Sequence, residues 1–195
     1  MTLLRLSLIL SFLLCLNGCA TIISATSGGD GIQENRGRRS VGAMIDDSSI
    51  ETAIKVNLSA ADEGLKKSHI SVISFNGTVL LVGQVPSQEL KNLATRVATS
   101  SSSRVKTVHN ELEVAGVTTF LSRSNDAWIT AKLKTLMLAN SNVSGLRTKV
   151  ITENGVVYLM GLVSQAEANQ IVELVSNTKG VTKVVRAFEY NDTTI

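Results

Sequence analysis

Two segments of this 195-residue chain repeat each other almost position by position. Residues 72–85 read VISFNGTVLLVGQV, and residues 150–163 read VITENGVVYLMGLV. The match continues upstream, where Asp47 aligns with Asp126. A repeat of roughly 70 residues constrains the fold more than any other feature, because both copies have to form the same structural unit.

Each copy opens with the spacing of an amphipathic helix. Apolar residues recur at the helical period over residues 50–58 in the first copy. The matching stripe of the second copy consists of Ile129, Leu133, Leu136 and Met137. Asp47 precedes the first stripe, and Ser124 or Asn125 precedes the second. We expect these residues to be N-caps, because their side chains accept hydrogen bonds from the first N–H groups of a helix.

Two short strands follow in both copies, joined by Asn-Gly, which is the strongest local signal for a β-hairpin. A second helix comes next, and Ser87 and Ser164 are placed to cap it. A last strand at 105–114 or 181–190 completes the copy. The order αββαβ predicts an α+β fold in which a three-stranded sheet carries two helices on one face. Since each copy is small for an independent core, we expect the two copies to pack together.

The N-terminus has the features of a secretory signal. A single positive charge, Arg5, precedes an apolar run at residues 6–16. That run is too short to span a bilayer, which takes about 20 residues, and it has the length of the apolar part of a signal peptide. We therefore expect the chain to be exported.

The run leads into Leu16-Asn17-Gly18-Cys19, which resembles the lipobox of bacterial lipoproteins. The resemblance implies a signal peptide at 1–18 and fatty acyl chains, such as palmitate, on Cys19 as the first mature residue. Ala20, which is not Asp, implies an outer-membrane destination on the periplasmic side. The alternative is an ordinary cleaved signal followed by a chance cysteine. Cys15 lies in the signal, so the mature chain keeps no thiol for a disulfide.

Residues 19–43 are rich in Gly, Ser and Arg and lack apolar periodicity. Such a composition buries too little apolar surface to order itself, so it predicts a flexible, lipidated tether. We place the first unit at 44–116 and the second at 124–191, with a short link between them.

The ordered set of motifs resembles the BON family. The residues that carry the resemblance are Asn76-Gly77 and Asn154-Gly155, the later Gly83 and Gly161, and the closing Val105-x-x-Val108 and Gly180-Val181-x-x-Val184. Arg104 stands where the family has a glycine before the first closing pair, so we expect a different turn there. The resemblance implies two αββαβ BON units without catalytic activity.

The segments Ser124-Asn125-Asp126-x-Trp128 and Glu153-Asn154-Gly155 are similar to those of BON proteins that are outer-membrane lipoproteins with two units. This resemblance implies that the second unit binds an anionic phospholipid, phosphatidylglycerol or cardiolipin. It also implies a role in outer-membrane integrity and at the division site, where periplasmic or division proteins are further candidate partners.

The only tryptophan lies off the apolar stripe of its helix. At about 100° per residue, Trp128 falls outside the stripe, with Lys132 between them. Tryptophan is enriched at membrane interfaces, and lysines are attracted to anionic headgroups. We therefore expect phospholipid contacts from Trp128, Lys132, Lys134, Leu138 and, in the last strand, Lys183.

The first copy provides an internal control, because Ser49 stands in the place of Trp128. Residues 44–116 hold seven Lys and Arg against eight Asp and Glu, whereas residues 120–195 hold eight against six. If one unit meets acidic lipid, the charges favour the second.

Three other roles for Trp128 and its unit stay open. The ring could pack against the first unit or close the core near the link, which is the commoner place for a tryptophan. Its face could instead dock a protein, which would make the chain a periplasmic interaction adaptor. The chain could also be a structural spacer that binds neither.

The sequence gives no pattern for catalysis or for a cofactor. His69 and His109 are the only histidines, and neither has a carboxylate or thiol at metal-ligand spacing. The pair Asp46-Asp47 suits helix capping and the helix dipole, and no serine lies in a nucleophile-elbow pattern. Without Arg5 the exported chain has a net charge of only about +2, a poor match for nucleic acid. We expect no enzyme activity, cofactor, metal ion or nucleic-acid partner.

Overall fold

The computed structural model describes residues 40–191 except 117, 142 and 144. The expected signal peptide, the lipidated Cys19 and the tether up to residue 39 lie outside the described residues. The described residues belong to one compact unit, Gly37–Ile195. Helix α3 begins at Val41, so the last positions of the expected tether are already helical.

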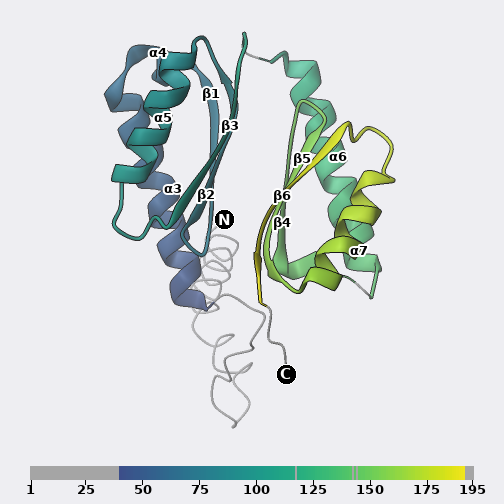
Figure 1. Cartoon of the computed structure of the whole chain (residues 1–195). Helices are drawn as coiled ribbons and strands as arrows, with labels where there is room; N and C mark the ends of the chain where they lie inside the picture. The colour runs from purple at the N-terminus through teal and green to yellow at the C-terminus, as the bar shows by residue number, and fades with distance from the viewer. Residues whose placement is uncertain (1–39, 117, 142, 144, 192–195) are drawn as a thin grey trace, which may run out of the picture. The chain divides into compact units, whose positions relative to one another are not determined.

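The first copy, called the first unit below, folds in the predicted order. Its elements are α3 (Val41–Ala61), α4 (Glu63–Lys67), β1 (His69–Phe75), β2 (Thr78–Val85), α5 (Gln88–Ser100) and β3 (Thr107–Val114). The sheet order is β1-β2-β3, with β1 antiparallel and β3 parallel to β2. Helices α3 and α5 cover one face of this sheet (Figure 1). The short helix α4 has no counterpart among the predicted elements.

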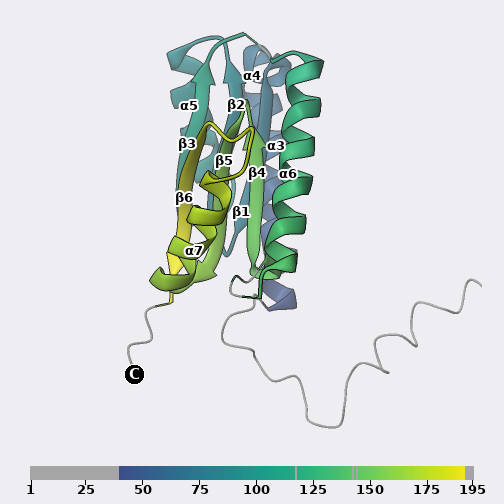
Figure 2. The ribbon, with the colours of Figure 1, turned by 90° about the vertical axis from the view of Figure 1, so that its right-hand side faces the viewer.

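The second unit repeats this arrangement. Its elements are α6 (Phe120–Ala139), a 3₁₀ turn η1 (Gly145–Arg147), β4 (Thr148–Glu153), β5 (Val156–Val163), α7 (Gln165–Ser176) and β6 (Lys183–Tyr190). The sheet order is β4-β5-β6, again antiparallel and then parallel. Helices α6 and α7 lie on one face of the sheet (Figure 2). The predicted α+β fold of two αββαβ units is confirmed.

Both predicted hairpins form around left-handed turn residues. The φ angles are 52° and 81° in Asn76-Gly77, and 50° and 76° in Asn154-Gly155. Two successive positive φ values define the type I′ turn that Asn-Gly favours. The turns before the last strands differ as expected, because Gly180 has a φ of 101° while Arg104 is not in the left-handed region.

The predicted caps of the second helices are confirmed. The Ser87 hydroxyl accepts the Leu90 N–H, and the Ser164 hydroxyl accepts the Glu167 N–H. Each bond satisfies one of the N–H groups that a helix start leaves without a partner. A hydrogen bond with Ser87 also holds the pKa of Glu89 below its usual value.

The predicted caps of the first helices are wrong. Ser40 caps α3 and Thr119 caps α6, so Asp47, Ser124 and Asn125 lie inside their helices. The last residues of the expected link therefore belong to helix α6, which begins at Phe120. The apolar stripe marks the part of each helix that covers the core, and the apolar residues of the exposed first turns lie off that stripe.

Asp47 and Asp126 tie their helices to the hairpins. The turn N–H groups of Asn76-Gly77 donate to Oδ2 and Oδ1 of Asp47 at 2.9 and 3.0 Å. Those of Asn154-Gly155 donate to Oδ2 and Oδ1 of Asp126 at 2.8 and 2.9 Å. Both carboxylates are buried. A charged acceptor with two donors strengthens such bonds, so each aspartate fixes its helix over the sheet.

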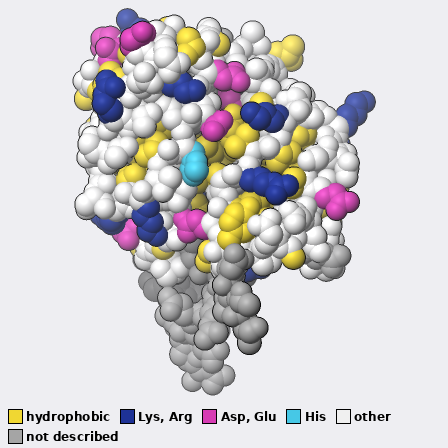
Figure 3. All heavy atoms as spheres, viewed as in Figure 1, with side chains coloured by type: hydrophobic (Ala, Val, Ile, Leu, Met, Phe, Trp, Pro, Cys, Tyr) yellow, Lys and Arg dark blue, Asp and Glu magenta, His cyan; other side chains and the backbone are white. Residues whose placement is uncertain are grey.

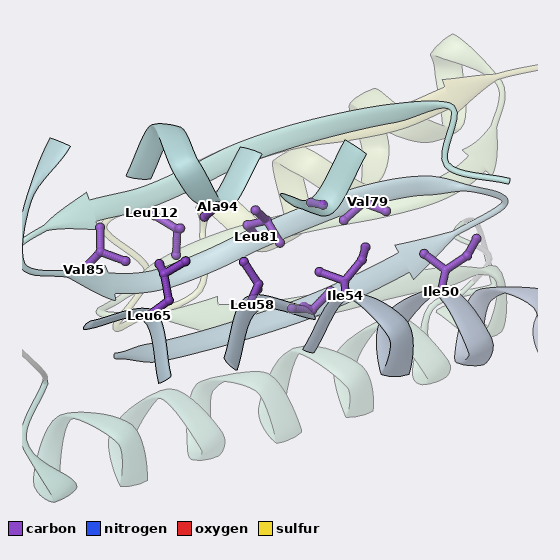
Figure 4. Close-up of a cluster of buried hydrophobic side chains, with 11 residues drawn as sticks. Ile50, Ile54, Leu58, Leu65, Val79, Leu81, Val85, Ala94 and Leu112 are labelled. Atoms are coloured by element: carbon purple, nitrogen blue, oxygen red, sulfur yellow. The ribbon is translucent and has the colours of Figure 1, made fainter. Parts of the chain in front are cut away.

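Each unit has its own apolar core between helices and sheet. Figure 4 shows the first core, with Ile50, Ile54, Leu58, Leu65, Val79, Leu81, Val85, Ala94 and Leu112. In the second core, α6 contributes Ile129, Leu133 and Met137. Leu136, which the sequence placed on the same stripe, is instead 40% exposed because it lies at the stripe's edge.

The sheet faces that carry no helices share a third apolar cluster. It contains Phe75, Leu80 and Val82 of the first sheet and Tyr158, Met160 and Ala187 of the second. Polar contacts accompany it: Lys149 Nζ lies 3.0 Å from Glu51 Oε1, and Gln84 Nε2 donates to Glu153 Oε1 at 2.9 Å. The expected packing of the two units against each other is therefore observed.

Candidate functional site

Helix α6 exposes several large apolar side chains. In the described part of the chain, Leu121, Trp128 and Leu138 of this helix are 79%, 58% and 62% exposed. The Trp128 ring is thus open to solvent. The alternative in which it is sealed under the first unit or closes the core is wrong.

These three residues lie on one side of α6. With the exposed Ala127 and Ala131, they point away from the sheet, because helical periodicity puts them opposite the buried stripe. We call Leu121, Ala127, Trp128, Ala131 and Leu138 the outer face of α6.

Every solvent-accessible charge on α6 is positive. By helical period, Lys132 borders the outer face on one side, and Arg123 and Lys134 border it on the other. The helix has one acidic residue, Asp126, which is buried against the hairpin. The face of the molecule seen in Figure 3, by contrast, mixes hydrophobic side chains with both Lys or Arg and Asp or Glu side chains. The outer face of α6 is therefore a mainly apolar strip, in which the exposed Ser124 and Thr135 also lie, with cations along both borders.

The cation nearest the tryptophan contacts it directly. Lys132 Nζ lies 5.2 Å from the centroid of the Trp128 ring. This is within the range of a cation–π interaction, which stabilises an exposed pair by about 0.5–1 kcal/mol. The ring and the ammonium group are therefore held together as one unit at the surface.

The buried Asp126 sets the direction in which this face points. It lies two residues before Trp128, and its carboxylate is held by the hairpin turn Asn154-Gly155. The helix cannot rotate about its axis without breaking both bonds. The outer face is therefore positioned by the sheet and not by the solvent-exposed residues themselves.

The structure brings together most of the residues expected at this site, but not all of them. Trp128 and Lys132 are in contact, and Lys134 and Leu138 lie further round the exposed side of the same helix. Lys183 is exposed on a different element, at the first position of β6, where it pairs with Val156 of β5.

Two residues of the site were missed by sequence reasoning. Leu121 and Arg123 precede the expected helix start but lie within α6, which begins at Phe120. The signal was present in the spacing, since Leu121 is seven residues, or two turns, before Trp128. Recognising Thr119 as the cap would have added both residues.

The matching helix of the first unit lacks this combination. Ser49 stands at the Trp128 position, and the exposed apolar residues Val41, Met44 and Ile45 lie at the start of α3. The first cation of α3 is Lys55, well after them, while Asp46 lies beside them. The first unit therefore does not present an apolar strip bordered by cations.

Within the described residues, no helix is long and apolar enough to cross a membrane. The same part of the chain contains no cluster of His, Cys, Asp and Glu that could hold a metal ion. His69 is half-buried, and its Nε2 lies 3.7 Å from Glu153 Oε2.

Two segments of the chain, 46–116 and 125–192, match the family model described as BON domain. The chain belongs to the BON family. Both BON matches begin inside the first helix of a unit, after the starts of α3 at Val41 and α6 at Phe120. The early turns that carry Leu121 and Arg123 therefore precede the matched segment.

Three relatives match most of the length of this chain. The chain is 35% identical over 191 residues to the outer membrane lipoprotein DolP of Haemophilus influenzae, with 96% of each chain covered. It is 36% identical to a 21 kDa hemolysin of Actinobacillus pleuropneumoniae over 78% of each chain. It is 33% identical to osmotically-inducible protein Y of Escherichia coli, covering 74% of this chain and 72% of that protein. The match to the first of these confirms the expected location at the outer membrane, facing the periplasm.

Proposed function

We propose that this BON protein is a non-enzymatic outer-membrane lipoprotein, anchored through acylated Cys19, that binds anionic phospholipid with the outer face of α6. Phosphatidylglycerol and cardiolipin are the expected lipids. Through this contact it helps to maintain outer-membrane integrity, including at the division site.

One observation carries the proposal: the exposed apolar strip of α6 has only cations on its borders. Such a helix lies in the plane of a bilayer surface with its apolar side among the headgroups and acyl chains. Trp128 suits that depth, because its ring is apolar while its N–H stays polar. Lys132, Lys134 and Arg123 would meet the phosphates on either side.

The expected affinity is modest. Each cation close to an anionic surface contributes on the order of 1 kcal/mol, and salt screens this attraction. A weak contact is sufficient when acyl chains already hold the protein at the membrane, because the tether raises the local concentration of lipid.

Vesicle flotation tests this proposal. The chain Gly37–Ile195 contains both units and all three apolar clusters, and it lacks the anchor that would mask a weak contact. We expect it to float with phosphatidylglycerol vesicles but not with phosphatidylcholine vesicles, and to be released by high salt.

The variant Trp128→Glu should lose at least about tenfold in vesicle binding, because a carboxylate replaces the ring and faces anionic lipid. Its free energy of unfolding should change by less than about 1 kcal/mol, because the position is exposed and only the cation–π contact with Lys132 is lost. Val56→Glu is the matched control, since Val56 is an equally exposed apolar residue on α3. The control should float like the parent chain.

Two results would contradict the lipid proposal. A large loss of stability in Trp128→Glu would show that the ring is structural. Failure to float with any anionic vesicle, combined with Trp128-dependent capture of a periplasmic protein, would favour the adaptor function instead.

A further inference from the structure

A cavity of about 540 Å³ lies beside the first strand of the second sheet. Its lining includes Arg123 and Lys134 of α6, His69 of β1, and the consecutive residues Val150–Glu153 of β4. Side chains of consecutive strand residues point to opposite faces of a sheet. A cavity that touches four in a row therefore runs along the edge of the strand.

Among the described residues, this edge of β4 has no neighbouring strand, because β4 is the outermost strand in the order β4-β5-β6. The direction of its backbone groups follows from the first unit. Ser74 of β1 pairs with Val79 as Thr152 of β4 pairs with Val157. The N–H and C=O groups of Ser74 point away from β2, since other partners bind them. The backbone groups of Thr152, and of Val150 two residues before it, therefore point away from β5.

The first unit closes the corresponding edge with two long charged side chains. Glu51 Oε1 accepts the Ser74 N–H at 2.8 Å, and Lys149 Nζ donates to the Ser74 carbonyl at 2.7 Å. Such plugging is a common way to prevent an edge strand from pairing with another chain.

The second unit lacks both plugs. Thr130 stands in the place of Glu51, and its hydroxyl bonds the Thr152 hydroxyl at 2.7 Å instead of the backbone. Ser71 stands in the place of Lys149 and is too short to reach across as the lysine does. The same edge is thus plugged by charged side chains in the first unit and not in the second, where Val150 and Thr152 keep 5% and 8% of their surface exposed. We call this unplugged border the open edge of β4.

The charges around the open edge favour an acidic occupant. Arg123 and Lys134 are exposed, and neither side chain bonds another described residue. The two acidic residues of the lining are largely buried and hydrogen-bonded, Asp126 by the hairpin N–H groups and Glu153 by Gln84. They keep their charge, but Arg123 and Lys134 are the charged groups most accessible to an occupant.

We propose that the open edge of β4 binds an extended acidic segment of a partner protein, which adds to the sheet as a further strand. Val150 and Thr152 would pair with its backbone, and its acidic side chains would reach Arg123 and Lys134. Strand addition of this kind obtains affinity from main-chain hydrogen bonds and specificity from side chains at alternate positions. A lipid headgroup has no row of alternating N–H and C=O groups to offer. This contact shares the border cations Arg123 and Lys134 with the outer face of α6 but uses none of its apolar side chains.

The test uses isotope-labelled Gly37–Ile195, which contains both folded units, and a defined probe. The probe is the capped hexapeptide Glu-Val-Thr-Val-Glu-Val. We expect it to shift the amide signals of Val150 and Thr152 and to slow their hydrogen exchange. The same peptide with alternate backbone nitrogens methylated should have no effect, because methylation removes the pairing donors and keeps every side chain.

Variants separate this contact from the lipid contact. Thr130→Glu recreates the plug of the first unit, so it should weaken peptide binding about tenfold while vesicle binding stays unchanged. Thr135→Glu, on the exposed side of the same helix, is the control and should bind the peptide normally. If Thr130→Glu is unstable, Arg123→Ser supplies the second test. It should weaken binding of the acidic peptide more than binding of the same peptide with Gln in place of Glu.

Three results would overturn the inference. The first is the absence of shifts at Val150 and Thr152 with the peptide at millimolar concentration. The second is shifts confined to the outer face of α6. The third is displacement of the peptide from the edge by short-chain phosphatidylglycerol, which would assign the cavity to a lipid. Because vesicle flotation is read separately, failure of either proposal leaves the other intact.

Discussion

Asp126 shows how much a single residue determines in this fold. Its position before an apolar stripe is typical of an N-cap, yet it is buried in mid-helix and accepts two turn N–H groups. Asp47 does the same in the first unit and also accepts the Ser74 hydroxyl at 2.7 Å. An aspartate reaches backbone donors in a turn as readily as those at a helix start, so the residue type alone does not separate the two roles.

Replacing Asp126 should therefore destabilise the protein. Asp126→Ala leaves buried turn donors without acceptors, and we expect the free energy of unfolding to fall by about 2 kcal/mol in urea titrations. Asp46→Ala is the control. Asp46 forms an exposed ion pair with Arg104, and its loss should change stability by less than about 1 kcal/mol. Equal losses in the two variants would contradict the role given to Asp126.

At the scale of elements, the second strands of the two hairpins, β2 and β5, have similar sequences but differ in backbone conformation. Gly83 has a φ of 126°, and a Cβ atom there would lie 2.0 Å from the His69 carbonyl oxygen. Gly161, its counterpart in the repeat, is outside the left-handed region, and its Cβ would lie 3.0 Å from the Arg147 carbonyl oxygen. The first position accepts no side chain without movement of β1.

Gly83→Ala should consequently cost more stability than Gly161→Ala. We expect a loss of about 2 kcal/mol or more at Gly83, from backbone strain together with the clash, and a smaller loss at Gly161. Thermal or urea unfolding of the two variants, compared in the same buffer, measures the difference. A larger loss of stability at Gly161 would contradict this expectation and show that the second unit tolerates a side chain at this position less well than the first.

The elements themselves could be predicted from the sequence because the repeat presents each signal twice. The Asn-Gly hairpins, the Ser87 and Ser164 caps and the order of helices and strands all follow from local patterns. The starts of α3 and α6 were not predicted, since their first turns extend beyond the core and their apolar residues lie off the buried stripe. For the same reason Leu121 and Arg123 were missing from the predicted site, while Trp128 and Lys132 were found.

At the scale of the whole molecule, the repeat predicts that the two units pack but not which residues meet. The contact uses the helix-free faces of both sheets, and the strand sequences are apolar on both faces. Alternation therefore could not show which side faces the helices. The open edge of β4 could not be predicted from the sequence either, because it depends on which side chains of one unit extend to the other.

The shared cluster makes stability sensitive to alkaline pH. Burial, reinforced by the charges of Glu111, Glu113 and Glu153, raises the pKa of Tyr158 from 10.0 to about 12. The folded protein therefore keeps a proton that the unfolded chain loses above about pH 10. The free energy of unfolding is unaffected below that pH and falls between about pH 10 and 12, by up to about 2–3 kcal/mol.

Tyr158→Phe should remove this part of the pH dependence. Urea titrations at about pH 9 and pH 11.5 would show a smaller difference in stability for the variant than for the parent chain. Tyr190→Phe is the matched control, because Tyr190 is the other tyrosine and is exposed. If the stability of the two variants depended on pH in the same way, a group other than Tyr158 would cause the loss of stability at alkaline pH.

Lys149 lies in the second copy of the repeat, but its ammonium group binds residues of the first copy. It donates to Glu51 and to the Ser74 carbonyl. The duplicated halves are for this reason no longer interchangeable. The later half completes the earlier one, whereas its own matching border receives no such side chain from the earlier half.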